Sequence, residues 1–387
     1  MFLRIKSMNL GPYRISEEKI SYRGNKLFSG IKDIAKEECS VNELENRVKN
    51  LRFNPMWGHI SKINHTINIS AHEFFHENGS LFTLLPLTTR MISSPGAVYG
   101  REAINYTTDT SPIKLKWFDL PNDAFLAESS QIYLELALLQ RDIRAVYSIY
   151  NSFRKERADS THLSEFHHIE YEGKICQKEN LKVISGLLSK LISDLLNKNG
   201  EDISYFVDKS HLVKLEELSS RLNINGFNPI KFSEALDALY DVKKDDKYKK
   251  FTLQNFGAWE ELMLTEIFGD IVCLSEFPLL EVPFYHDEIK GSCPRTADSS
   301  DIIWPGYREI IGSGHRIESI EDLEKKAKIF NLPRRDYEPY LQSRQSSNYE
   351  VTSGFGLGWE RFLQGLLEMP YIWSAVQFPR VDKTLKP

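Results

Sequence analysis

The chain has 387 residues and a mass of 44.8 kDa, which exceeds one average domain and also fits a single large α+β or α/β domain with an appendage. Hydrophobic residues make up 41% and aromatic residues 12%, so the composition excludes a fibrous chain and leaves little room for disorder. The net charge of -5 gives no sign of non-specific nucleic-acid binding. No stretch approaches the roughly 18 apolar residues of a membrane span, and the first residues lack a secretory signal, so we expect a cytoplasmic protein without a membrane partner.

Residues 1–57 mix charge with short apolar pieces, which predicts an irregular or partly helical N-terminal extension before a catalytic domain at 58–387. From His59 the isoleucine spacing predicts a helix that ends at Asn78-Gly79. An extended run follows at 81–85 and is closed by Pro86.

The middle of the chain predicts a helix at 131–140 and then a β-hairpin, with strands at 146–153 and 166–171 joined by a charged loop. Apolar residues then recur at helical spacing, which predicts a helical insertion at about 176–250 that ends in the charged run KKDDKYKK. The remaining expected elements are strands at 279–285, 302–304 and 309–311, a helix at 320–330 and a glycine-rich strand-to-helix turn at 354–361.

Two patterns for metal binding are weak. The four cysteines show no C-x-x-C pair or finger spacing, so the sequence indicates neither a disulfide framework nor a structural zinc site. The segment His72-Glu73-Phe74-Phe75-His76 matches H-E-x-x-H, in which two histidines on one helix face bind zinc. No third ligand is identifiable, and the two phenylalanines are typical of a helix core, so we interpret the segment as structural.

Two other motifs place charge beside aromatic or glycine residues. Arg154-Lys155-Glu156 ends the first strand of the expected hairpin, and Phe166 begins the second. A guanidinium group there can hold a phosphate with two hydrogen bonds, and a ring can stack on a base, although charge pairs across strands are usually structural. In GFGLGWER, which ends at Arg361, the glycines would let a ligand approach the strand backbone.

In their order along the chain, these motifs resemble motifs 2 and 3 of the class II aminoacyl-tRNA synthetases, in the asparaginyl and aspartyl branch. Gly79 and Pro86 lie as in motif 1 of that family. The resemblance covers roughly residues 60–380. The other segments that carry it are FLAESSQ (125–131), HLSEF (162–166), REIIGSGHRI (308–317) and FPR (378–380).

The resemblance implies an α+β fold, the class II synthetase fold, in which an antiparallel sheet of about six strands is flanked by helices. It also implies a homodimer that transfers the adenylyl group of ATP to the carboxylate of an amino acid, with release of pyrophosphate and with the help of Mg²⁺. Gln131 would hold the amino or carboxylate end of that substrate, and Arg316 would read its side chain. Asp301 and Glu309 would hold the metal. The implied catalytic and ATP-binding residues are Arg154, Glu156, His162, Phe166, Glu309, Gly358 and Arg361.

Other positions depart from the family pattern. Residues 1–57 lack the five-strand pattern of the family's oligonucleotide-binding barrel, which leaves tRNA as an uncertain partner. Ser93-Ser94-Pro95-Gly96 replaces a Glu-Gly pair, and Thr161 replaces an arginine before His162. Asp287 replaces the arginine of an F-Y-M-R segment. If Asp287 faces Arg316, the pocket favours a carboxamide or an amine over a free carboxylate.

The function expected from the sequence is ATP-dependent adenylation of asparagine, aspartate or a related amino acid by a tRNA-independent paralogue of the family. The acceptor would be ammonia, as in the archaeal asparagine synthetases that resemble this branch, or another amine. One alternative is genuine aminoacylation of tRNA, and another is a non-catalytic regulator that binds an amino acid or a nucleotide. The retention of Arg154, Glu156, Glu309 and Arg361 argues against the regulator.

Overall fold

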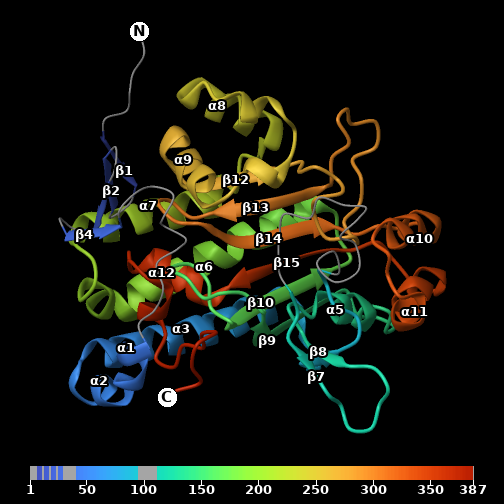
Figure 1. Cartoon of the computed structure of the whole chain (residues 1–387), viewed down its shortest axis with the longest axis horizontal. Helices are drawn as coiled ribbons and strands as arrows, with labels where there is room; N and C mark the ends of the chain where they lie inside the picture. The colour runs from blue at the N-terminus through green and yellow to red at the C-terminus, as the bar shows by residue number, and fades with distance from the viewer. Residues whose placement is uncertain are drawn as a thin grey trace.

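The computed structural model describes residues 41–94 and 111–386, and the backbone of four strands between residues 7 and 28 (Figure 1). These strands pair antiparallel in the order β1-β2-β3-β4. The four strands were not predicted, because strands of four residues are too short to leave a periodic signal, whereas residues 41–53 are mostly helical, in agreement with a partly helical extension. Their bounds, with those of the two helices that follow, are β1 (Ser7–Leu10), β2 (Tyr13–Ser16), β3 (Lys19–Tyr22), β4 (Asn25–Phe28), α1 (Val41–Glu45) and α2 (Arg47–Phe53).

An eight-stranded sheet in the order β11-β12-β13-β14-β15-β10-β9-β5 forms the centre of the protein. Its neighbours pair antiparallel except at the two edges, where β11 and β5 run parallel to their partners. The expected α+β fold with an antiparallel sheet between helices is confirmed. The strand bounds are β5 (Leu81–Phe82), β9 (Ala145–Phe153), β10 (Glu165–Gly173), β11 (Ile230–Lys231), β12 (Val272–Ser275), β13 (Ser299–Ile303), β14 (Glu309–His315) and β15 (Ser353–Gly358).

The predicted hairpin is formed by β9 and β10, and the register of β10 with β15 shapes one face of the sheet. His168, Glu170 and Glu172 lie opposite Gly358, Gly356 and Gly354. Because side chains alternate along a strand, these three and Phe166 share one face. The facing strand carries no side chains at the paired positions, so this face has room for a cavity.

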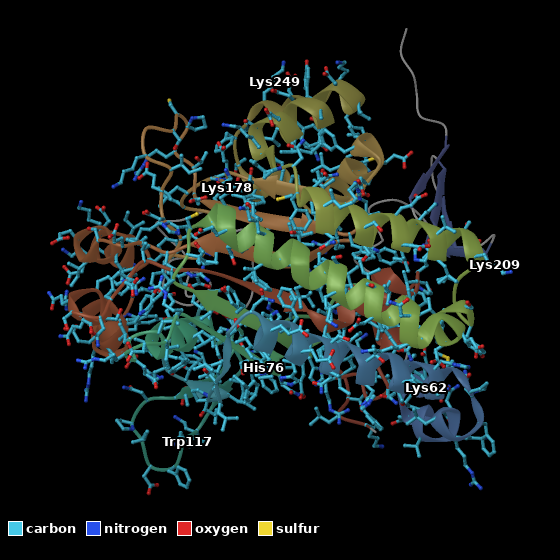
Figure 2. The ribbon with its side chains drawn as sticks, turned by 180° about the vertical axis from the view of Figure 1, so that it is seen from behind. Lys62, His76, Trp117, Lys178, Lys209 and Lys249 are labelled. Carbon is cyan, nitrogen blue, oxygen red and sulfur yellow. The ribbon has the colours of Figure 1, made fainter. Side chains whose placement is uncertain are left out.

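The opposite face of the sheet is covered by two long helices that run side by side, α3 (Met56–Glu77) and α6 (Gln177–Ser204) (Figure 2). Ile67 of α3, Leu188 of α6 and Leu357 of β15 are all fully buried in the largest hydrophobic cluster. Residues 176–250 are mostly helical, as predicted, but α6 is part of the layer that covers the sheet. The helices that follow α6 are α7 (Lys209–Asn225) and α8 (Phe232–Lys243). That residues 176–250 form an insertion into the catalytic domain therefore stays a prediction.

The strand predicted at 279–285 was wrong, because the chain makes turns there. Pro278 and Pro283 lack the N–H group that a sheet needs, which accounts for the difference. Elements that the spacing did not predict include β12, α9 (Ala258–Phe268) and α11 (Arg334–Gln342). The elements still to be named are α5 (Gln131–Ala137), α10 (Ile320–Ile329), α12 (Trp359–Leu366) and a small sheet of β6 (Thr88–Thr89), β8 (Ala124–Leu126) and β7 (Lys114–Leu115).

The H-E-x-x-H segment lies in α3, as expected. Nδ1 of His72 is 2.7 Å from the hydroxyl oxygen of Tyr147, and Phe75 is fully buried against the sheet. Both side chains thus have structural partners. Among the residues that the structure describes, no helix is long and apolar enough to cross a membrane.

Candidate active site

Two adjoining cavities lie on the face of the sheet that α3 and α6 leave uncovered. We call them the Arg361 cavity and the Arg316 cavity, after one residue that lines each. The Arg316 cavity has a volume of about 220 Å³. Four residues line both cavities and mark their junction: Arg154, His168, Glu309 and Gly356.

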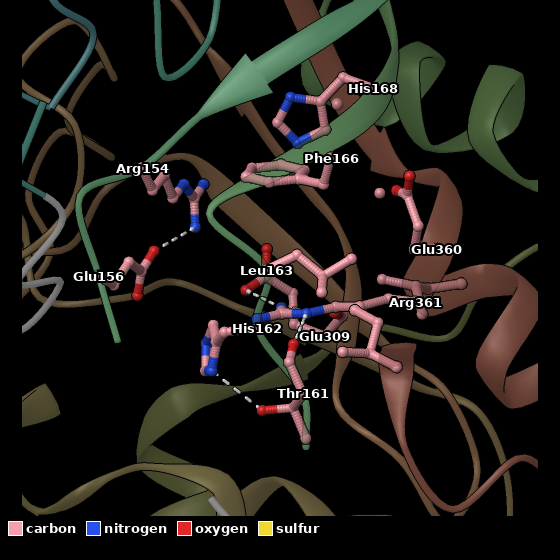
Figure 3. Close-up of a pocket in the computed structure, with 14 residues that line it drawn as sticks. Arg154, Glu156, Thr161, His162, Leu163, Phe166, His168, Glu309, Glu360 and Arg361 are labelled. Atoms are coloured by element: carbon pink, nitrogen blue, oxygen red, sulfur yellow. Dashed lines mark hydrogen bonds and ion pairs between the residues drawn. The ribbon is translucent and has the colours of Figure 1, made fainter. Parts of the chain in front are cut away.

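The Arg361 cavity places two guanidinium groups around an aromatic ring (Figure 3). Cζ of Arg154 lies 5.1 Å from the ring centroid of Phe166, and Nη1 of Arg154 lies 3.8 Å from Oε1 of Glu156. Nη1 of Arg361 donates to the carbonyl oxygen of Glu309 at 2.9 Å. Nε of Arg154 is buried and has no hydrogen-bond partner among the described residues, so this guanidinium group keeps an N–H donor for a ligand.

The electrostatics of this cavity favour an anion. Burial, and then the neighbouring charge of Arg308, lower the pKa of Arg361. Burial also lowers the pKa of His162, although its Nδ1 lies 2.9 Å from Oδ1 of Asp159. An anion with several charges would offset the repulsion between the arginines, and the flat ring of Phe166 suits the face of a base.

Two carboxylates converge at the junction. A Cβ atom at Gly312 would lie 3.0 Å from Oε1 of Glu309, on the same strand, and 3.6 Å from Oδ1 of Asp301, on the neighbouring strand β13, so both carboxyl groups cover this glycine. Burial, and then the charges of Glu309 and Glu261, raise the pKa of Asp301 well above its usual value. A divalent cation would relieve this repulsion, and carboxylate oxygens are its preferred ligands. The described residues hold no cluster of three potential metal-binding side chains, so the pair suits a cation that also binds phosphate and water oxygens.

The Arg316 cavity is bounded by a buried network. Nε2 of Gln131 donates to the carbonyl oxygen of Tyr171 at 2.8 Å and to the carboxylate of Glu172. Nε and Nη2 of Arg316 donate to the two oxygens of Glu172 at 3.0 and 2.7 Å. A second carboxylate, that of Glu135, lies 3.6 Å from Nε of Arg316.

The charge of Arg316 is therefore neutralised by the protein itself. Its side chain is 1% exposed, and burial alone would disfavour the charge, but the carboxylate of Glu172 raises the pKa above its ordinary value. Nη1 makes no hydrogen bond to the described residues, which leaves one donor edge for an occupant of the cavity. Gly354 is required beside this network, since a Cβ atom there would overlap Glu172 and Gln131.

The structure brings together all but one of the predicted site residues. Asp287 lines neither cavity: its N–H donates to the carbonyl oxygen of His315 at 2.9 Å, and its carboxylate acts on the charge of Lys326. The prediction that Asp287 contributes an acceptor beside Arg316 is thus corrected, because the preceding residue, His286, occupies that wall. The roles expected for the other predicted residues, which line the cavities, stay predictions.

Sequence reasoning missed several residues of the site. Glu128 is 1% exposed; its Oε2 accepts a hydrogen bond from the N–H of Ser94 at 3.2 Å, and its Oε1 has no partner among the described residues. Burial raises the pKa of Glu128 to about 8, although the charge of Arg154 opposes this. On β10, His168 and Glu170 could have been found from strand alternation, since they follow Phe166 at every second position.

Comparisons with known proteins agree with this geometry. A family model described as tRNA synthetases class II (D, K and N) matches residues 41–382. The asparagine–tRNA ligase of Pyrococcus horikoshii is 30% identical over 331 residues, which are 85% of this chain and 69% of that protein. The asparagine–tRNA ligase of Borreliella afzelii is 27% identical over 85% of this chain and 71% of its own length. The crystal structure of the Pyrococcus horikoshii asparaginyl-tRNA synthetase complexed with asparaginyl-adenylate has a TM-score of 0.76 and 29% identity, covering 90% of this chain and 74% of that one.

Proposed function

The chain belongs to the class II tRNA synthetases of the D, K and N group, and we propose that its two joined cavities activate asparagine as an adenylate. Members of this family are ATP-dependent ligases that form an aminoacyl-adenylate. The observation that carries the proposal is the junction. Arg154 and Glu309 line both the cavity suited to a nucleotide and the cavity suited to an amino acid, so the α-phosphate of ATP and the substrate carboxylate would meet there.

In the proposed reaction the substrate carboxylate attacks the α-phosphate of ATP, and pyrophosphate leaves. Phe166 would stack on the adenine ring, and Arg361 would bind the leaving phosphates. Arg154, which keeps an unpaired N–H group, would stabilise the charge that develops on the α-phosphate. Mg²⁺, held by Asp301 and Glu309, would neutralise further phosphate charge. Fixed charges of this kind accelerate the reaction because they need no reorganisation.

The charge balance of the Arg316 cavity favours asparagine over aspartate. Glu172 already neutralises Arg316, so a substrate carboxylate would gain little attraction from it. Glu170 is a second buried carboxyl group in the same wall, and burial raises its pKa to about 7. A neutral carboxamide can accept from Nη1 of Arg316 without adding negative charge beside Glu170. Glu128, which has one unpaired oxygen, would accept a hydrogen bond from the substrate's ammonium group.

The relatives are named asparagine–tRNA ligases, so tRNA is the favoured acceptor of the activated amino acid. Ammonia or another amine is the second candidate. The feature that favours it is the N-terminal sheet. Its described segments form four strands in simple sequential order, whereas the oligonucleotide-binding barrel of the family has five strands. The two acceptors leave the adenylation step unchanged and differ only in the final product.

The proposal is tested by amino-acid-dependent exchange of pyrophosphate into ATP, with a panel of amino acids and with or without tRNA. We expect asparagine to support exchange better than aspartate. Charging of added tRNA would identify tRNA as the acceptor, and an amide formed only with an added amine would identify the second candidate. No exchange with any amino acid would overturn the proposed function in favour of a binding protein.

We expect Asp301→Asn to increase the concentration of Mg²⁺ needed for half-maximal exchange by roughly tenfold or more, because one hard ligand of the cation becomes neutral. The free energy of unfolding should rise or stay constant, since burial, and then the charges of Glu309 and Glu261, raise the pKa of Asp301, and a neutral amide avoids both the burial of a charge and the repulsion. A magnesium titration of the exchange rate measures the first effect. An unchanged requirement would remove Asp301 from the metal site.

Exposed apolar side chains at the edge of the sheet favour the expected homodimer. Leu81, Phe82 and Leu84 are 52%, 46% and 87% exposed, and among the strands that the structure describes β5 has a neighbour on only one side. Leu85, the last residue of the run predicted at 81–85, instead packs partly against Leu134 and Leu138 inside the protein.

We therefore expect a dimer in sedimentation velocity at micromolar concentration, and we expect Leu84→Lys to shift it to monomer, because obligate interfaces are large and apolar. Val213→Lys, at an equally apolar but distant exposed position on α7, is the control and should stay dimeric. A wild-type monomer would contradict the assignment of this edge.

A further inference from the structure

We infer that His286 reads the nitrogen end of the substrate's side chain, accepting a hydrogen bond from the amide N–H while Arg316 donates to the amide oxygen. The inference rests on the proposed activation of asparagine and adds the residue that would distinguish its nitrogen from carbon. The sequence analysis had expected Asp287 to be the acceptor beside Arg316, and His286, the residue before it, now takes that role.

The position of His286 supports this role. Its side chain lines the Arg316 cavity and is 7% exposed, and its backbone forms a β-bridge with Arg316. Neither ring nitrogen makes a hydrogen bond to any described residue, and only Nδ1 is completely buried, so Nε2 is the nitrogen that an occupant of the cavity can reach. Polar groups inside a protein are nearly always paired, and a donor bound at Nε2 would supply the partner that this nitrogen lacks.

The ring is held firmly in this place. Nζ of Lys326, on α10, donates to the carbonyl oxygen of His286 at 2.6 Å. A Cβ atom at Gly314 would lie 2.7 Å from Nε2 and 2.8 Å from two carbons of the imidazole, so the ring rests directly on the glycine backbone. The hydrogen bond fixes the backbone of His286 and the glycine supports its ring, so the side chain loses little entropy when it binds a ligand.

The surrounding charges keep the ring neutral and therefore able to accept. The groups that face it are Arg316, Lys326 and His315. Burial, and then the positive charge of Arg316, lower the pKa of His286 well below its ordinary value. A neutral imidazole has one nitrogen with a free lone pair, which suits an amide N–H and offers nothing to a methyl group of the same size.

The test compares asparagine with 4-oxonorvaline, an isostere in which a methyl group replaces the amide nitrogen, in the exchange assay. We expect the wild-type protein to prefer asparagine by about tenfold, as for one well-placed hydrogen bond. His286→Met should reduce kcat/KM for asparagine about tenfold and leave that for 4-oxonorvaline unchanged. Gly314→Ala should act likewise by displacing the ring. His65→Ala, at an exposed histidine of α3 that lines neither cavity, is the control.

Equal losses for both substrates, or an unchanged preference in both variants, would overturn the inference. A second measurement does not depend on the folding of variants: the imidazole carbon resonance of His286 in labelled wild-type protein should shift with asparagine and not with 4-oxonorvaline. Binding of asparagine without this shift would refute the role of His286 alone. Failure of the wild-type protein to exchange any amino acid would instead refute the proposed function on which the role rests.

Discussion

Arg361→Ala and Arg154→Ala should each lower the rate of asparagine-dependent exchange by roughly two orders of magnitude or more, which is typical for the loss of one fixed charge contact in a transition state. Both guanidinium groups line the Arg361 cavity, and Arg154 also borders the Arg316 cavity. The larger effect on kcat should appear in Arg154→Ala, because its unpaired Nε is available for the charge that develops on the α-phosphate.

The matched control is Arg334→Ala, since Arg334 is an exposed arginine of α11 that pairs with Glu324 and Glu338 and lines neither cavity. Its exchange rate should equal that of the wild-type protein. Urea unfolding of all three variants separates loss of function from loss of the fold. We expect Arg361→Ala to fold, because burial and Arg308 already disfavour the charge of Arg361. Wild-type rates in folded Arg154→Ala and Arg361→Ala would exclude both residues from the reaction.

Local patterns were sufficient to predict the elements that carry the site. The alternation of β9 and β10, the isoleucine spacing of α3 and the glycine-rich strand that leads into α12 each lie within one segment, and the structure has all of them. Arg154, Phe166 and Arg361 line the Arg361 cavity. Each of them lies at the end of a strand or helix whose position the sequence pattern predicts, so their place in the cavity follows from these elements.

What the sequence could not provide depends on contacts between distant segments. Asp287 and His286 are adjacent, so only the β-bridge to Arg316 decides which of them faces the cavity. The carboxylate that holds Arg316 is Glu172, which lies 144 residues away along the chain. Glu128 was not predicted for the same reason, because its hydrogen-bond partner Ser94 lies in a different loop of the chain.

Glu128→Gln should make the protein more stable and less able to bind its amino acid. The pKa of Glu128 is raised from 4.5 to about 8, so the folded carboxyl group holds its proton more tightly than the unfolded one. The stability that this group contributes is thus fully present below about pH 4.5 and is lost as the pH rises towards 8. At about 1.4 kcal/mol for each pKa unit, and allowing for relaxation, we expect the neutral amide to add about 1–3 kcal/mol at pH 8.

Urea unfolding at pH 5.5 and pH 8 measures this effect. The wild-type free energy of unfolding should fall relative to that of Glu128→Gln as the pH rises, and Glu216→Gln, at an exposed carboxyl group of α7, should follow the wild type. A difference between Glu128→Gln and wild type that does not change with pH would show that the carboxyl group is not protonated in the folded state.

Binding should change in the opposite direction. Only the ionised form of Glu128 can pair with the substrate's ammonium group, so the wild-type KM for asparagine should fall between pH 6.5 and pH 8 as that form becomes accessible. Glu128→Gln should raise KM at pH 8 by about tenfold or more, as for the loss of a buried charge-assisted hydrogen bond, and should abolish its pH dependence. A bound ammonium group would also lower the pKa of Glu128, so asparagine binding should release a proton, which calorimetry in buffers of different ionisation enthalpy can detect. The same KM in both proteins across this pH range would assign the ammonium group to another residue, and the unpaired oxygen of Glu128 would then be a purely structural cost.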